Sequence, residues 1–285
     1  MPAVFVLIWS TGFVVARYGM PHAPPLGFLT LRYALSLLAF GVWILFARAV
    51  WPRGAAQWGH LVMAGTLLHA GYLGGVWMAV KAGIGAGTVA LVVGLQPVLT
   101  ALWLSASGSA KAVARRQWLG LALGLCGLIL VVGQRLGRGE ITPTNMALAV
   151  LALLAITTGT LYQKRFVAPC DVRTASAVQL AAALALTAPL AWLEAGTWQL
   201  HAELVGAMVW SVLVLTLGGS SLLYLLIQRG AATRVASLMY LVPPCTALLA
   251  WLLFGEPLGG LVLVGLAVTA VGVALVVREP VRRAP

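Results

Sequence analysis

The chain has 285 residues, of which 61% are hydrophobic and only 8% are charged, and its mean hydropathy is +1.00. Soluble domains carry roughly a quarter charged residues, so this composition excludes an ordinary soluble domain. The net charge of +12 is spread over the short loops between apolar runs, and this distribution excludes a nucleic-acid-binding patch. The runs are continuous and about 20 residues long, which is typical of transmembrane helices and not of the alternating strands of a membrane barrel. The sequence therefore predicts an all-α membrane protein.

Ten such runs, separated by polar residues, proline or glycine, predict ten transmembrane helices. The connections between them are short, so they leave little sequence for a soluble domain. The predicted spans cover about residues 2–19, 25–47, 57–80, 86–107, 115–134, 144–166, 172–194, 204–228, 232–254 and 258–277.

The basic residues predict the orientation of these helices. Thirteen of the 18 Lys and Arg residues lie on the side of the membrane that holds both termini, four lie on the opposite side, and Arg32 lies within a span. Because cytoplasmic loops carry the excess of Lys and Arg, we expect both termini in the cytoplasm. The same excess is expected to contact anionic lipid of the bilayer.

The second half of the sequence repeats the first at an offset of 147 residues, so that Pro97 meets Pro244. Each half contains five predicted spans, an odd number, and the second half therefore enters the membrane from the opposite side. Inverted repeats of this kind occur in secondary transporters, whose binding sites lie near the bilayer midplane where the repeats meet. We expect two five-helix repeats, residues 1–140 and 141–285, in one membrane domain. A duplication kept only for structural closure is the alternative.

Four stretches carry a pattern shared with a known family. They are IWSTGFVVAR in the first span, PPLGFLTLRYALSLLAF in the second, VALVVGLQPVLTALWL from the fourth, and ASLMYLVPPCTALLAWLLFGEPLGG from the ninth span into the tenth. Together they resemble the two EamA-type repeats of the drug/metabolite transporter superfamily. The most specific element runs from Pro244 to Glu256. The first half departs from it, because Gly108 is followed by Ser109 where the acid is usual.

The resemblance implies a ten-helix exporter of amino acids and other metabolites in the bacterial inner membrane. Within the superfamily, the tryptophan-rich sequence looks most like the bacterial aromatic amino-acid exporter branch.

A glutamine and a proline, Gln96 and Pro97, interrupt a run that carries no formal charge from Ala82 to Ala110. Proline removes one backbone donor and frees a carbonyl about a turn earlier, which neighbouring helices or water can satisfy. The pair Pro243-Pro244 occupies the corresponding place in the second half. We expect these positions to line a pocket or to act as hinges, and a static kink is the alternative.

The third and eighth spans contain matching glycine-rich stretches, HAGYLGGVW from His69 and TLGGSSLLY from Thr216. Glycines there allow close helix approach or bending. The expected hinge glycines are Gly71, Gly74, Gly75, Gly218 and Gly219. Aromatic side chains could stack on a flat or apolar substrate, although interfacial belts also collect Trp and Tyr. The candidates for substrate contact in these two spans and the ninth are Tyr72, Trp77, Ser220, Tyr224 and Tyr240.

Three charged or titratable residues have open roles. His69 lies near mid-membrane, where it could relay protons or contact a carboxylate, or pack as a neutral hydrogen-bonded residue. For Arg32 the pattern favours a structural role over attraction of a substrate carboxylate, because its repeat mate Gln179 preserves hydrogen bonding but not charge. Lys81 could contact an anionic group of the substrate or anchor the end of its helix.

Polar and aromatic residues of the first and sixth spans complete the expected lining of the substrate site. These residues are Trp9, Ser10, Thr11, Thr157 and Tyr162. Hydroxyl groups can also bond back to their own helix, which makes them weak indicators of function.

The sequence thus predicts a secondary exporter of small metabolites, most of all aromatic and other apolar amino acids, that works by alternating access. Export of drugs, nucleosides or other metabolites, and a non-transporting structural or receptor-like membrane protein, are the alternatives. An intramembrane enzyme is disfavoured because no Asp or Glu lies mid-span and only His69 lies well inside a span. The cysteines Cys126, Cys170 and Cys245 show no metal-ligand spacing, so we expect no metal and no cofactor. The expected partners are a small-molecule substrate and the lipid bilayer, with no nucleic acid.

Overall fold

The computed structural model describes residues 2–47, 49–106, 115–136, 140–219, 222 and 241–277. Within these residues the ordered elements are all helical, which confirms the prediction of an all-α protein. The elements are α1 (Pro2–Gly19), α2 (Pro25–Phe46), α3 (Ala55–Gly65), η1 (Thr66–Gly71), α4 (Tyr72–Lys81), α5 (Ala86–Val93), α6 (Gln96–Ala106), α7 (Arg115–Leu136), α8 (Pro143–Phe166), α9 (Val172–Leu193), α10 (Ala202–Val209), η2 (Trp210–Gly219), α13 (Val242–Phe254) and α14 (Gly260–Val277). The two segments labelled η are π-helical.

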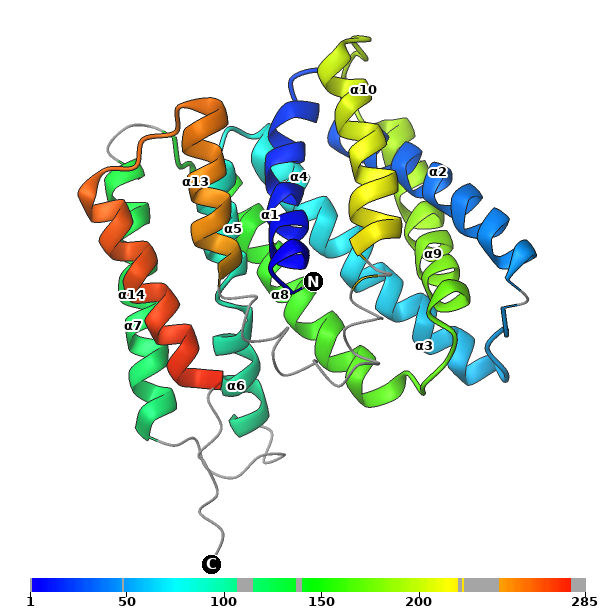
Figure 1. Ribbon diagram of the computed structural model, residues 1–285, viewed down its shortest axis with the longest axis horizontal. Coiled ribbons are helices and arrows are strands. Elements are labelled where there is room, and N and C mark those ends of the chain that lie inside the picture. The colour runs from blue at the N-terminus through cyan, green and yellow to red at the C-terminus, as the bar shows by residue number, and fades with distance from the viewer. Residues whose placement is uncertain are drawn as a thin grey trace, which may run out of the picture.

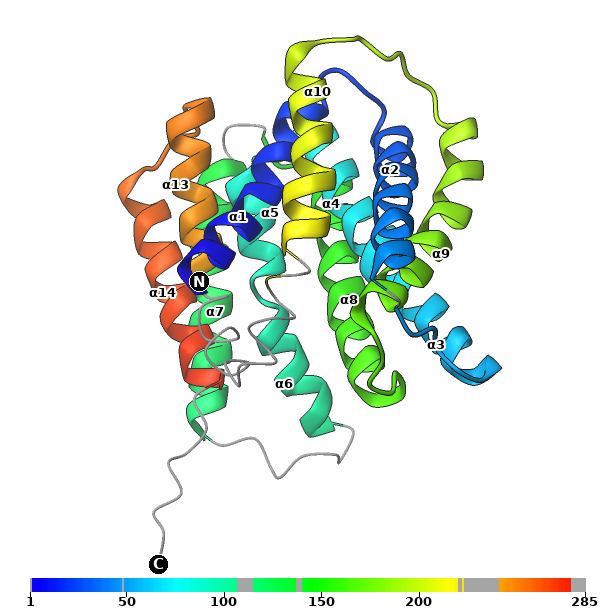
Figure 2. The same cartoon turned by 45° about the vertical axis from the view of Figure 1, so that its right-hand side comes forward.

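The described helices form a single bundle (Figure 1). Helices α5, α6, α7, α13 and α14 lie on one side of it, and helices α2, α3 and α9 lie on the other, with α1, α4, α8 and α10 between them (Figure 2). The central helices connect the two sides, because α8 packs on α5 and on α3, while α4 packs on α5 and on α2.

In the part of the chain that the structure describes, five stretches are long and apolar enough to cross a membrane. They are Pro25–Phe46, Ala55–Lys81, Pro143–Phe166, Val172–Leu193 and Ala202–Gly219. Shorter apolar helices occupy Val4–Gly19, Ala86–Thr100, Trp118–Val131, Val242–Phe254 and Gly260–Leu275. Large apolar side chains such as Phe46 (85% exposed) and Trp192 (90% exposed) point out of the bundle, as lipid-facing residues do. The chain therefore has the helices of a membrane protein, and the count of ten spans stays a prediction.

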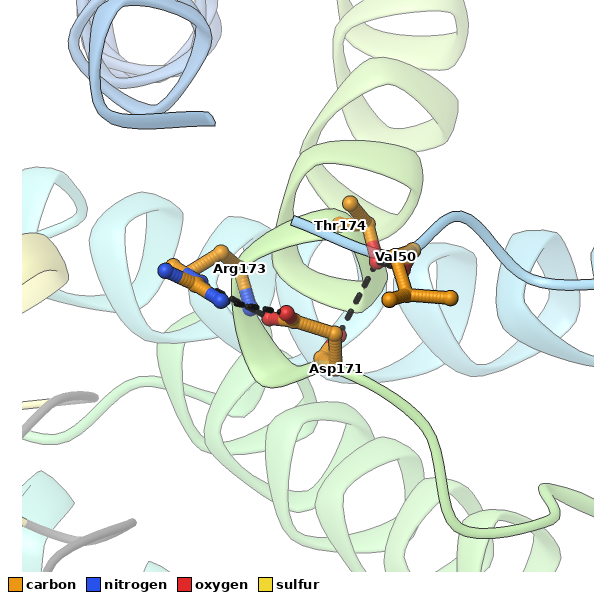
Figure 3. Close-up of polar contacts among 4 residues, drawn as sticks. All are labelled: Val50, Asp171, Arg173 and Thr174. Carbon is orange, nitrogen blue, oxygen red and sulfur yellow. Dashed lines mark hydrogen bonds and ion pairs between the residues drawn. The ribbon is translucent and has the colours of Figure 1, made fainter. Parts of the chain in front are cut away.

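Helices α2 and α9 lie side by side and run in opposite directions (Figures 1 and 2). At one end of the pair, the backbone N–H of Gly27 donates to Oε2 of Glu194 over 3.0 Å. At the other end, Oγ1 of Thr174 donates to the carbonyl of Val50 over 2.8 Å (Figure 3). The bounds of the two helices differ by 147 residues at both ends, which is the offset seen in the sequence.

Helices α1 and α8 are also oppositely directed. Nζ of Lys81, at the end of α4, donates to the carbonyl of Met20 just after α1 over 2.6 Å. Nδ2 of Asn145, in the first turn of α8, donates to the carbonyl of Ala82 over 3.2 Å. The end of α1, the end of α4 and the start of α8 thus meet at one end of the molecule.

Local sequence determines where α8 and α13 begin or end. Oγ1 of Thr142 accepts from the N–H of Asn145, whose side chain accepts in turn from the N–H of Thr142, so the two form a capping box. Pro143 occupies the first turn, where its missing N–H costs nothing. Gly255 ends α13 in the left-handed conformation, with φ of +63°, which glycine adopts without strain.

Candidate functional site

Six polar side chains meet where α2 and α9 cross the two π-helical segments. We call them the central polar cluster: Arg32, Tyr33, His69, Tyr72, Gln179 and Thr216. They come from both halves of the sequence. Arg32 and Gln179 each lie about 10 Å inside their helices, counted from oppositely placed ends at ~1.5 Å per residue. The cluster therefore lies in the interior of the bundle.

Arg32 of α2 bonds to η2. The guanidinium is 7% exposed, and its Nε and Nη2 donate to Oγ1 of Thr216 over 3.3 and 3.1 Å. The Thr216 hydroxyl donates in turn to the carbonyl of Ser211, five residues earlier, over 2.8 Å. The Thr216 side chain thus donates a hydrogen bond to a carbonyl of its own π-helical segment and accepts hydrogen bonds from a cation of a neighbouring helix.

The corresponding contact in the other half joins α9 to η1. The side chain of Gln179 lies close to that of His69, and its Nε2 donates to Oε1 of Gln163 over 3.2 Å. Gln179 lies 147 residues after Arg32, and Thr216 lies 147 residues after His69. The two contacts are therefore counterparts, one with a charged donor and one without.

Close helix approach brings Gln179 to η1. Gly65 precedes η1, and a Cβ built on it would collide with the backbone carbonyl of Gln179. Only glycine permits this separation of α3 and α9.

Two tyrosines surround the cation and the imidazole. The hydroxyl of Tyr33 donates to the carbonyl of His69 over 2.8 Å, and the two rings meet edge to face with centroids 6.1 Å apart. Tyr72, 7% exposed, lies with Tyr33 within electrostatic range of Arg32. The cluster thus combines one fixed positive charge with neutral donors and acceptors, which suits recognition of a polar or anionic group. π-Helical turns occur frequently at functional sites.

The predicted interruption at Gln96 and Pro97 coincides with a break between two helices. Helix α5 ends at Val93 and α6 begins at Gln96, with Gly94 and Leu95 in the turn between them. Nε2 of Gln96 donates to Oγ1 of Thr160 in α8 over 3.0 Å. The turn also packs against the start of α13, where Pro243 and Pro244 lie in the first turn. Motion at these residues stays a prediction.

The expected hinge glycines of the third span differ in their surroundings. A Cβ on Gly75 would lie 2.9 Å from the Leu148 carbonyl of α8, and one on Gly71 would lie 3.1 Å from Cβ of Ala155. Gly74 is buried, yet among the described residues no atom lies within 4 Å of the place where its Cβ would be. Gly71 and Gly75 therefore hold α8 close, whereas Gly74 does not.

The glycines of η2 face their own segment. A Cβ on Gly218 would lie 3.3 Å from the carbonyl of Leu213, and one on Gly219 would lie 3.7 Å from that of Val214. They leave more room than Gly75, because each meets a carbonyl of the same π-helical turn and no backbone of a neighbouring helix.

Trp77 and Lys81 lie outside the cluster and contact neighbouring protein atoms. Trp77 is 1% exposed and stacks on Phe28 with ring centroids 4.4 Å apart. Lys81 binds the carbonyls of Met20 and Ala23 after α1. Both residues thus connect α4 to the first two helices.

The hydroxyls predicted in the first and sixth spans bond mainly to their own helices. Ser10 donates to the carbonyl of Val6, and Thr157 to that of Leu153, each over 2.7 Å. Thr11 donates to the carbonyl of Ile8 and accepts from Nε1 of Trp210 over 2.9 Å. Their donors are therefore already used within the protein.

The remaining aromatic candidates fall in two places. Trp9 packs against Phe5 with centroids 5.4 Å apart. Tyr162 lies near the end of α8, where its hydroxyl is 2.8 Å from Nδ1 of His60 and its ring packs on Phe166. The structure does not bring either residue into the central polar cluster. Ser220, Tyr224 and Tyr240 lie outside the described residues.

Of the predicted site residues, the structure brings His69 and Tyr72 together. Sequence reasoning did not single out Tyr33 or Thr216 as site residues. The offset of 147 residues contained the signal for Thr216, because it is the counterpart of His69. Tyr33 carries no such signal, since only the fold shows that its hydroxyl reaches η1.

Two surface hollows are lined by residues outside the cluster. One has a volume of about 490 Å³ and is lined by Pro21, Lys81 and Glu194, among others. The other, about 340 Å³, is a mainly apolar groove that includes Gly71, Ala155 and Thr187. The first hollow contains a positive residue, Lys81, and a negative residue, Glu194, at the end of the molecule where α4 ends.

The whole chain resembles proteins of known class. It is 26% identical to a "Probable amino-acid metabolite efflux pump" of Salmonella typhimurium, over 94% of this chain and 90% of the relative. It is 24% identical to the Escherichia coli protein of the same description, with the same shares covered. It is also 26% identical to an uncharacterized transporter of Bacillus subtilis, over 96% of this chain and 89% of the relative. These relatives are transporters or pumps, which confirms the prediction of a transporter and not an enzyme.

A solved crystal structure has the same fold, with a TM-score of 0.64 at 20% identity over 96% of this chain and 95% of its own. The model of the EamA-like transporter family matches residues 3–133 and again residues 144–278. Since these two segments cover far more than half of the sequence, this membrane transporter belongs to the EamA-like transporter family.

Proposed function

We propose that the protein exports small amino-acid-like metabolites, and that it does so by alternating access between two inverted five-helix repeats, residues 1–140 and 141–285. The two repeats together form one ten-span membrane domain. The cargo binds between them and not within either one.

Helix geometry supports the repeats. The family model matches the two halves separately, and the mates α2 and α9 are antiparallel with bounds at a constant offset. The pairings between halves also occur twice: α1 packs on η2 as α8 packs on η1, and α2 packs on η2 as α9 packs on η1. Such an arrangement offers two near-equivalent states, one open to each side of the membrane, which alternating access requires.

The observation that carries the proposal is the central polar cluster. It lies between the halves, the contact of Arg32 with Thr216 is the counterpart of that of Gln179 with His69, and both use a π-helical segment. Polar groups inside a membrane are costly and mark substrate or ion pathways. We therefore place the substrate beside this cluster, in reach of Tyr72 and His69.

The proposed substrates are amino acids with aromatic or other apolar side chains. The relatives described as amino-acid metabolite efflux pumps support the amino-acid class. A zwitterion needs polar partners for its charged groups, which the cluster offers, and an apolar pocket for its side chain. Ser220, Tyr224, Tyr240 and Gln96 belong to the proposed lining. Trp9, Thr11 and Tyr162 are assigned to helix packing and not to substrate contact, as are Trp77, Ser10 and Thr157.

The proposed location is the bacterial inner membrane with both termini in the cytoplasm. The excess of Lys and Arg on the terminal side supports this orientation. Export then moves substrate from the side of the termini to the side where α4 ends.

Flux into and out of liposomes tests the proposal. Purified protein should speed L-phenylalanine and L-tryptophan flux well above that of empty vesicles. Flux equal to that of empty vesicles across a panel of amino acids would refute the amino-acid assignment. A single-cysteine labelling scan of the loops tests the orientation, because it reports which loops react from outside the cell.

A further inference from the structure

We propose that Arg32 binds the carboxylate of the transported substrate, and that this contact makes the protein select carboxylate-bearing molecules over their amides and amines. The inference rests on the proposed export function and specifies the chemistry that the site recognises.

Arg32 is a buried cation without a protein counter-ion among the described residues. It is 7% exposed, and of its five N–H donors the two that bond do so to one hydroxyl oxygen, that of Thr216. The groups that influence it electrostatically are the phenols of Tyr33 and Tyr72, which are neutral at physiological pH. The cluster thus solvates the cation with neutral dipoles only.

The acidic residues of the described chain are bound elsewhere. Glu194 accepts from Gly27, Glu203 from His22, Asp171 from Arg173, and Glu256 from the backbone of Ala86, while Glu140 lies two residues before Thr142, the cap residue of α8. The described structure therefore supplies Arg32 with no negative partner.

A buried charge is ordinarily paired, because burial without a partner is strongly unfavourable. The guanidinium fork matches the two oxygens of a carboxylate and binds them with parallel hydrogen bonds. The carboxylate of an incoming substrate would supply the missing charge and use the donors that Thr216 leaves free. After the substrate is released, Arg32 again lacks a negative partner, and this would favour the return of the empty transporter to the state that binds substrate.

The counterpart contact indicates that the charge is not needed for helix packing. Gln179 joins α9 to His69 of η1 as Arg32 joins α2 to Thr216 of η2. A neutral amide thus suffices to connect a helix to a π-helical segment in this fold. Since only one of the two equivalent positions is charged, the protein holds one carboxylate site.

The test uses the full chain in liposomes and three labelled compounds: L-phenylalanine, 3-phenylpropionate, which lacks the amine, and L-phenylalaninamide, which lacks the carboxylate. Rates through empty vesicles are subtracted. Arg32→Gln copies the residue of the other half, and Arg32→Lys keeps the charge without the fork. Arg173→Gln is the matched control, because that cation already has a counter-ion in Asp171.

We expect wild type and Arg173→Gln to move the two carboxylates at least about tenfold faster than the amide. Arg32→Gln should reduce this ratio by about tenfold to a hundredfold, the range for hydrogen bonds to a charged group, and Arg32→Lys should fall between. An unchanged ratio in Arg32→Gln would overturn the inference while leaving the amino-acid function standing. If the protein moves 3-phenylpropionate in a manner that depends on Arg32 but does not move L-phenylalanine, the amino-acid function is refuted and the inference stands.

A second readout separates recognition from structure. The melting temperature of ligand-free Arg32→Gln in detergent should equal or exceed that of wild type, because the substitution removes a buried charge that lacks a partner. A melting temperature clearly below wild type would assign Arg32 to helix packing and overturn the inference, as would a wild-type protein that moves the amide as fast as the acids.

Discussion

Gly94, in the turn between α5 and α6, lies directly against the ring of Pro243 at the start of α13. A Cβ built on Gly94 would be 2.6 Å from Cγ of Pro243 and 3.0 Å from the carbonyl of Ala90. The helix break of the first half and the proline pair of the second half are therefore in contact. Any movement of the α5–α6 turn against the start of α13 therefore has to change the contact between Gly94 and Pro243.

Gly94→Ala should destabilise the protein and slow transport. The added methyl group meets a rigid ring and a backbone carbonyl, and overpacking of this kind costs about 1–3 kcal/mol. Thermal unfolding in detergent and flux in liposomes measure the two effects. Gly41→Ala in α2 is the control, because no described atom outside the backbone of its own helix lies within 4 Å of the place where its Cβ would be, and it should be neutral or more stable by up to about 1 kcal/mol. Equal stability of the two variants would contradict the packing argument.

Substitution by alanine should destabilise the protein at only one of two adjacent glycines of α4. Gly75→Ala places a methyl group 2.9 Å from the Leu148 carbonyl and 3.0 Å from Ala152 of α8, whereas Gly74→Ala meets no described atom within 4 Å. We expect Gly75→Ala to lose about 1–3 kcal/mol of unfolding free energy and most of its flux, and Gly74→Ala to fold like wild type. If Gly74→Ala alone abolishes flux without loss of stability, then Gly74 borders the substrate path.

The sequence was sufficient to predict the helices and the place where the fourth span breaks. Continuous apolar runs mark the spans, and the proline at position 97 marks the break. The sequence does not indicate whether a given residue of a span faces lipid or a neighbouring helix, because both surroundings are apolar. In a soluble protein the polar face of a helix shows its orientation, and a transmembrane span lacks that face. Trp77 looked like a pocket wall for this reason, and the structure stacks it on Phe28.

The two π-helical segments were equally beyond sequence reasoning. Each π-helical segment is accompanied by a tertiary contact, here the close approach of Gly65 to Gln179 and the bond from Arg32 to Thr216. The polar residues themselves were visible, but the meeting of Arg32 with Thr216 joins positions 184 residues apart. Only the fold brings them together.

Lys81 should act as an anchor of α4 and not as a substrate contact. Its ammonium group binds the carbonyls of Met20 and Ala23, and hydrogen bonds to charged groups are worth about 1.5–3 kcal/mol. Lys81→Met keeps the apolar stem and should lower the unfolding free energy by about 1–2 kcal/mol, with unchanged preference among substrates. Thermal unfolding and competition between L-phenylalanine and its amide measure this. A changed preference with unchanged stability would instead give Lys81 a role at the mouth of the substrate path.

The start of α9 should make stability depend on pH. Asp171 accepts hydrogen bonds from the N–H, Nε and Nη2 of Arg173 (Figure 3). The Arg173 side chain, more than any other group, lowers the pKa of Asp171 below its ordinary value of 3.8. The stabilisation is thus complete above pH 3.8 and is lost as the pH falls through the lower folded-state pKa.

Asp171→Asn tests this dependence, because asparagine can still cap the helix but cannot form the ion pair. The pair lies at the protein surface and is only partly exposed, 26% at Arg173 and 15% at Asp171. Because surface ion pairs contribute little, we expect the melting temperature to fall by only about 1–3 °C at pH 7, and the difference from wild type to vanish in strong acid. Melting curves of both proteins from pH 7 downward measure it. A difference that persists once the carboxyl is protonated would show that the side chain acts through its shape and not its charge. Added salt should shrink the difference at pH 7, since an ion pair at the protein surface is screened, whereas an effect of shape would not respond.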